Sequence, residues 1–148
     1  MLATDGSPSA EAATSEAIEL AAQFDAPLVV VCVLQDPTPA YGYYGYAEIA
    51  SELRRGQEQR IQEVYAAVAE QAESAGVDCR LLQLEGQPGE RICRAAADRN
   101  ARMVVLGAHG WGRLGRLIHG SVSTYVLHHA SMPVLVVQST EAEVPAHQ

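Results

Sequence analysis

The sequence contains no lysine. All ten basic residues are arginines, against eighteen acidic residues, for a formal net charge of −8 over 148 residues. A P-loop and an enzyme that forms a Schiff base each need a lysine amine, so both classes are excluded. The acidic balance, without an arginine-rich block, also argues against nucleic acid as a partner, because the phosphate backbone is bound by basic patches.

Cysteines and long apolar runs are also scarce. Cys32, Cys79 and Cys93 lie far apart, with neither a C-x-x-C pair nor the spacing of metal ligands, so we expect no metal site. Cys32 sits in an apolar run and Cys93 on a helical face, so we expect buried small hydrophobic residues there. The longest apolar run, 28–34, is too short to cross a bilayer, and no charged-then-apolar leader opens the chain. We therefore expect a cytoplasmic protein without a membrane partner.

Strand-like and helix-like segments alternate along the chain. Apolar runs predict five strands, and helical spacing predicts four helices. The strands are expected at 1–4, 28–34, 79–84, 102–106 and 133–138, and the helices at 9–24, around 61–75 with Gly76 as the cap, at 89–100 and at 121–130. This alternation predicts an α/β fold, a single-domain open parallel sheet with helices on both faces. We expect one domain over 1–140 and a tail over 141–148, and the tyrosine-rich segment 35–46 is predicted to be a loop.

The most informative segment is 107–121, which holds five of the twelve glycines and joins the fourth strand to the last helix. Glycine lets a ligand approach the backbone closely. A helix start offers N–H groups without intrahelical partners and the positive end of a dipole. A strand, a glycine loop and a helix start in this order predict an anion site, and phosphate is the ligand it favours.

Other side chains fit such a site. Asp5 follows the first strand and, as an acceptor, can hold ribose hydroxyls or a metal-bound water. Ser121 and Ser123 supply hydroxyl donors at the helix start. Arg113 and Arg116 could clamp phosphate oxygens in place of a lysine, although arginines in loops are more often simply solvated.

Simpler roles remain open for several of these residues. Asp5 could serve only the start of the first helix, and Gly120 with Ser121 could form an ordinary loop and cap. His109 could merely hydrogen-bond to the loop backbone. A glycine loop of this length would then have no explanation, since long loops in compact domains are usually functional.

The motif G-x2-G-x9-G-S is met by Gly107, Gly110, Gly120 and Ser121. Together with the opening T-D-G-S at 4–7, the run V-V-C-V at 30–33 and the ending M-P-V-L-V-V at 132–137, it resembles the universal stress protein family, in its nucleotide-binding branch. The likeness extends along nearly the whole chain.

The resemblance implies a Rossmann-like sheet, as in adenine nucleotide alpha hydrolases, with strand order 3-2-1-4-5. It implies ATP or a related adenine nucleotide, with Mg²⁺ carried by ATP, between the first and fourth strands. Adenine and ribose would contact Ala3, Thr4, Asp5 and the backbone of Val33. Ribose and the first phosphates would contact Gly107, His109 and Gly110, and the outer phosphates Gly120, Ser121, Val122 and Ser123.

The resemblance has two further implications. It implies a homodimer that pairs through the last strand, Val134–Val137. It also makes the first strand central, and four residues are few for a central strand. Either the chain begins late or part of the central pairing is absent.

Three functions follow. The first is a regulatory, stress-response module that binds ATP. The second is a slow ATPase or nucleotidyl-transfer enzyme; because no Asp or Glu lies between 107 and 139, we expect no rapid turnover and assign no catalytic residue. The third is an interaction domain of the same fold that binds no nucleotide. A flavodoxin-like carrier shares the architecture, but no residue pattern places a flavin here.

Overall fold

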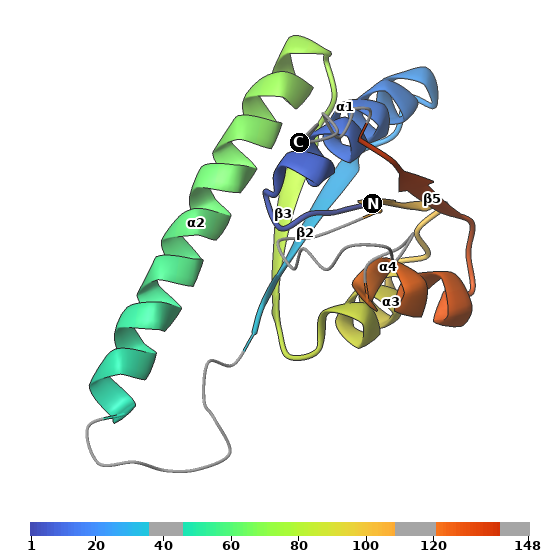
Figure 1. The fold of residues 1–148 in the computed structure, drawn as a ribbon. Helices are drawn as coiled ribbons and strands as arrows, with labels where there is room; N and C mark the ends of the chain where they lie inside the picture. Colours follow the sequence, from blue (N-terminus) through green and yellow to red (C-terminus); the bar gives the residue numbers. More distant parts are fainter. Residues whose placement is uncertain (36–45, 109–120, 140–148) are drawn as a thin grey trace, which may run out of the picture.

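In the parts of the chain that the structure describes, residues 1–35, 46–108 and 121–139, five parallel strands form one open sheet with four helices (Figure 1). The strand order β3-β2-β1-β4-β5 of this computed structural model confirms the predicted order. The elements are β1 (Leu2–Ala3), α1 (Pro8–Gln23), β2 (Leu28–Leu34), α2 (Tyr46–Ser74), β3 (Cys79–Glu85), α3 (Pro88–Asp98), β4 (Val104–Gly107), α4 (Ser121–His129) and β5 (Val134–Val137).

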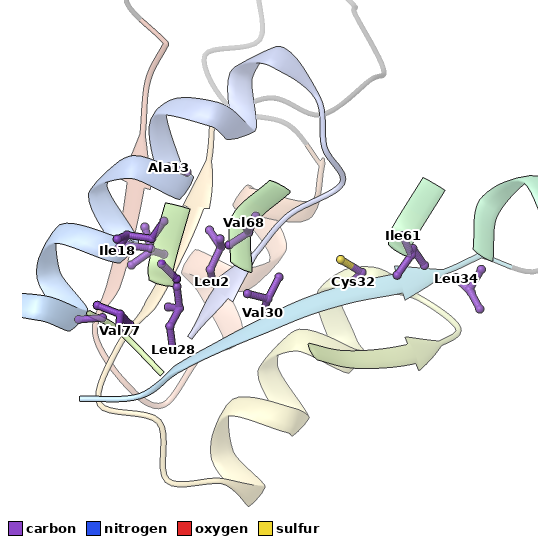
Figure 2. Packing of buried hydrophobic residues seen from close by; sticks show 14 residues of the cluster. Leu2, Ala13, Ile18, Leu28, Val30, Cys32, Leu34, Ile61, Val68 and Val77 are labelled. Carbon is purple, nitrogen blue, oxygen red and sulfur yellow. The ribbon is translucent and has the colours of Figure 1, made fainter. Parts of the chain in front are cut away.

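The helices cover both faces of the sheet, as predicted. α1 and α2 pack on one face against alternate side chains of β2, namely Leu28, Val30 and Cys32 (Figure 2). α3 and α4 pack on the opposite face, against Val31 of β2 and Leu106 of β4. Successive strand side chains point to opposite faces, so each strand contributes to both apolar layers.

The central strand is the shortest one. Leu2 and Ala3 each pair with β2 on one side and with β4 on the other, and both side chains are buried. Just beyond them, the N–H of Thr4 still donates to the carbonyl of Val31 at 3.1 Å. The strand predicted over 1–4 is thus in its expected place, but it is only two residues long.

The start of α2 is the largest difference from the predicted elements. The helix begins at Tyr46, inside the segment expected to be a loop, and its first turns leave Ile49 56% and Leu53 50% exposed. Its end agrees with the prediction, since Gly76 has a φ of 72° just after the last helical residue. Neither α2 nor another helix in the described ranges is both long and apolar enough to cross a membrane.

Two glycines with positive φ provide a matched test of how α2 packs on the loop after β1. A Cβ at Gly6 (φ 71°) would lie 2.2 Å from Cγ2 of Val64, whereas nothing lies within 4 Å of a Cβ at Gly76 (φ 72°). Gly76→Ala should cost about 1–2 kcal/mol through backbone strain alone. Gly6→Ala should cost about 1–3 kcal/mol more because Val64 must move. Urea unfolding measures the difference, and equal losses would contradict this packing.

Candidate functional site

A cavity of about 580 Å³ lies at the carboxyl ends of β1, β2 and β4. Open α/β sheets bind ligands at this edge, where the winding changes direction. The cavity lining includes eight of the twelve residues predicted as nucleotide contacts: Ala3, Thr4, Asp5, Val33, Gly107, Ser121, Val122 and Ser123. The other four, His109, Gly110, Arg113 and Gly120, lie outside the described residues. The structure therefore brings the described eight together, and their contact with a nucleotide stays a prediction.

The turn between β1 and α1 is shaped by its own polar groups. Oγ1 of Thr4 accepts a hydrogen bond from the N–H of Gly6 at 3.2 Å, and Oδ1 of Asp5 accepts one from the N–H of Ser7 at 2.9 Å. Ser7 is the N-cap residue of α1. The simpler role considered for Asp5, at the start of the first helix, is thus present. The same bond orients the exposed carboxylate at the cavity edge.

The end of β4 is packed closely on both sides. The N–H of Ala108 donates to the carbonyl of Val137 at 2.9 Å, and the carbonyl of Ala108 accepts from the buried hydroxyl of Ser123 at 3.1 Å. A Cβ at Gly107 would lie 2.7 Å from the carbonyl oxygen of Ser9, so only glycine lets α1 approach here. Gly107 and Ser123 therefore have structural contacts that the sequence did not predict.

The start of α4 forms another wall of the cavity. Its first residue, Ser121, is exposed and Val122 is half-buried, and both line the cavity. The N–H groups of a first helical turn have no partner within the helix, and the helix dipole is positive at this end. This wall can therefore hold an anion without a cationic side chain of its own.

A cysteine thiol lies in the β2 wall. Burial, and to a smaller extent the negative charge of the nearby Asp5, raises the pKa of Cys32 to about 12. Only the thiolate is a nucleophile, so this side chain serves as apolar lining. Its 2% exposure confirms the prediction of a buried small hydrophobic residue, whereas Cys93, for which the same was predicted, is only partly buried.

The sequence analysis did not assign α2 to the site. Gln57, Arg60, Ile61 and Val64 of this helix line the cavity. The signal lay in the spacing: Gln57 and Arg60 come four residues before Ile61 and Val64, so the polar pair continues the face of the apolar pair. Arg60 is the one cationic side chain among the described residues that line the cavity.

Two comparisons with known sequences indicate the same protein family. The sequence matches the profile of the universal stress protein family over residues 1–138. A universal stress protein of Methanocaldococcus jannaschii is 34% identical over 145 residues, which cover 97% of this chain and 83% of that protein.

Solved structures of the family share the fold. UspA from Lactobacillus plantarum has a TM-score of 0.83 at 26% identity, covering 93% of this chain and 95% of its own. A universal stress protein in complex with cAMP has a TM-score of 0.71 at 22% identity, covering 94% and 95% of the two chains. Another, from Archaeoglobus fulgidus in complex with dAMP, has a TM-score of 0.64 at 21% identity, covering 93% and 94%.

The raised pKa of Cys32 gives a labelling test of the cavity wall. With a pKa of about 12 in the folded protein, only about one thiol in ten thousand is ionised at pH 8. Iodoacetamide at pH 8 should therefore modify Cys32 far more slowly than the less buried Cys93, and urea should remove the difference. Mass spectrometry of peptides measures both rates. Equal rates in the folded protein would show that the thiol is not buried as described.

Proposed function

Because this chain belongs to the universal stress protein family, we propose that it binds an adenine nucleotide in the cavity at the carboxyl ends of β1, β2 and β4. The bound nucleotide then regulates the protein's interactions. The observation that carries the proposal is that one cavity joins the Asp5 carboxylate to the start of α4. A ribose acceptor and a phosphate cradle are the two polar elements a nucleotide site needs.

The cavity fits the ligand in size and chemistry. A volume of about 580 Å³ lies within the range of small-molecule sites. Cys32 and Ile61 give it apolar walls for a base, Asp5 can accept from ribose hydroxyls, and Ser121 with Val122 presents first-turn N–H groups to phosphate. Relatives of the same fold that hold cAMP and dAMP support the adenine base.

ATP is the nucleotide we propose for this site. The G-x2-G-x9-G-S motif in the sequence would supply backbone N–H groups to more than one phosphate, and Mg²⁺ would enter bound to those phosphates. We propose regulation and not catalysis because hydrolysis needs a general base near the terminal phosphate. The segment 107–139, which contains the proposed phosphate-binding residues, has no Asp or Glu.

A charge reversal at Ser121 tests the phosphate end. Ser121→Glu places a carboxylate where phosphate is expected, so the affinity for AMP and ATP should fall by at least about tenfold. The free protein should keep its stability, because glutamate is favourable in the first turn of a helix. Isothermal titration calorimetry measures the affinity, and urea unfolding without ligand measures the stability.

Ser121→Gln is the matched control, since it adds the same bulk without charge. We expect this variant to bind more tightly than the glutamate variant. For the unaltered protein, ATP at a hundred times its dissociation constant should add about 2.7 kcal/mol of stability. If AMP, ADP and ATP produce neither binding heat nor stabilisation, the proposed function is refuted. If the glutamate and glutamine variants bind with equal affinity, the phosphate does not lie at the start of α4.

We also propose that two copies pair through β5. This strand lies at the sheet edge, and its four residues are apolar and half-buried. The N–H of Val104 donates to Pro133 and that of Ala108 to Val137, so the alternating backbone groups of Val134 and Val136 point away from β4. An apolar edge with outward N–H groups favours pairing with another strand.

Proline at the outer edge tests this pairing. Val136→Pro removes an N–H that β4 does not use, so it should leave the sheet intact but convert the dimer to a monomer. Val136→Ala removes similar side-chain contacts and keeps the N–H, so it should remain dimeric. Sedimentation velocity at micromolar concentration measures the mass. A monomeric unaltered protein, or a dimer that survives Val136→Pro, would exclude the edge pairing.

A further inference from the structure

One face of α2 closes the side of the cavity that is remote from α4. Gln57, Arg60, Ile61 and Val64 recur at helical spacing, and all four line the cavity. Ile61 is buried and Val64 half-buried against the sheet, while Arg60 is exposed at the rim. The face thus passes from an apolar part on the sheet to a polar part at the cavity opening. We call these four residues the α2 wall.

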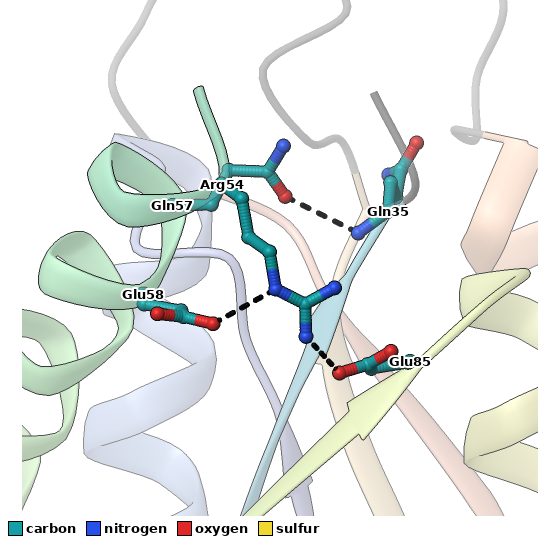
Figure 3. Close-up of polar contacts among 5 residues, drawn as sticks. All are labelled: Gln35, Arg54, Gln57, Glu58 and Glu85. Atoms are coloured by element: carbon teal, nitrogen blue, oxygen red, sulfur yellow. Dashed lines mark hydrogen bonds and ion pairs between the residues drawn. The ribbon is translucent and has the colours of Figure 1, made fainter. Parts of the chain in front are cut away.

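Polar contacts fix the α2 wall at the end of β2 and β3. The guanidinium of Arg54 forms ion pairs with Glu85, the last residue of β3, and with Glu58 at 3.0 Å (Figure 3). Oε1 of Gln57 accepts the N–H of Gln35, the residue after β2, at 3.2 Å (Figure 3). The helical turn before Arg60 therefore contacts the end of β2, which borders the cavity, and the end of its neighbour β3.

A second contact fixes the turn after Arg60. Val64 packs so closely on Gly6 that a Cβ there would lie 2.2 Å from its methyl carbon. Gly6 directly follows Asp5, the acceptor proposed for ribose. The backbone of Arg60 is thus held between the end of β2 and the loop after β1. Its exposed side chain lines the cavity from this stretch of backbone.

The two ends of the cavity differ in chemistry. The start of α4, on the α3 and α4 face of the sheet, offers N–H groups for phosphate, whereas the α2 wall belongs to the opposite face (Figure 1). A nucleotide with its phosphate at α4 and its ribose near Asp5 extends its base toward β2 and α2. In that orientation the base would lie on the side of the cavity that Arg60 lines. A guanidinium is planar and weakly hydrated, so it can lie flat on a purine ring.

We propose that Arg60 stacks on the purine ring of the bound nucleotide and so selects for a base at this end of the cavity. This rests on the proposed function, because it takes the nucleotide orientation from there. The contact needs the planar guanidinium, and a positive charge alone does not replace it. The ligand class is a purine nucleotide.

Substitutions of Arg60 separate stacking from charge. Arg60→Met and Arg60→Lys should both weaken AMP binding by about fivefold, because the lysine keeps the charge but lacks the flat surface. Neither should change the affinity for ribose 5-phosphate, which has no base. Arg55→Met is the matched control: it removes an exposed arginine of the same helix that does not line the cavity, and AMP binding should be unchanged. Isothermal titration calorimetry gives all affinities.

Three outcomes would overturn the proposal. Wild-type affinity in Arg60→Lys would make the contact one of charge, and an equal loss for ribose 5-phosphate would move it to the phosphate. A similar loss in Arg55→Met would make it a general effect of net charge. If the unaltered protein binds AMP and both Arg60 variants bind AMP with the same affinity, only this inference fails. If the unaltered protein binds no adenine nucleotide, the proposed function fails first.

Discussion

The pairing of a two-residue central strand is the constraint on which the cavity depends. Leu2 and Ala3 pair with β2 on one side and with β4 on the other, and the chain then continues through Asp5 into α1. β4, its neighbour, leads toward α4 on the opposite face of the sheet. Parallel strands end at one edge, and the helices that follow β1 and β4 in the sequence, α1 and α4, lie on opposite faces of the sheet, so the cavity lies between them at that edge. Loss of this short pairing would separate Asp5 from the start of α4.

The close packing around this edge explains several residues that sequence patterns assign to a ligand. Gly107 lacks a side chain because the backbone of Ser9 lies where a Cβ would stand. Ser123 donates its hydroxyl to Ala108 and thereby ties α4 to the end of β4. A residue type suited to phosphate binding can thus be required by packing as well. Such residues can be required by packing and by the ligand together. If their substitution abolishes ligand binding, that loss alone does not prove that they contact the ligand.

The sequence predicted the elements with a strong packing signal and missed those without one. β2 occupies the predicted range because a run buried on both faces is almost entirely apolar and β-branched. α2 was recognised from Ile61 onward, where its apolar face meets the sheet. Its first turns escaped notice because Ile49 and Leu53 are exposed and form no regular buried stripe. The same turns lead into the α2 wall, so that part of the cavity was missed with them.

The sequence by itself determined the alternation of strands and helices, the two-faced burial of the sheet and the order of the residues placed at its carboxyl edge. It also determined the exclusion of lysine-dependent chemistry. Only the tertiary structure decided that Gln57 and Arg60 reach the same cavity as Asp5 and Ser121. Periodicity reports which face of a helix is buried, because burial acts on each segment separately. Which segments meet at one cavity depends on contacts between residues far apart in the chain, and no local pattern records them.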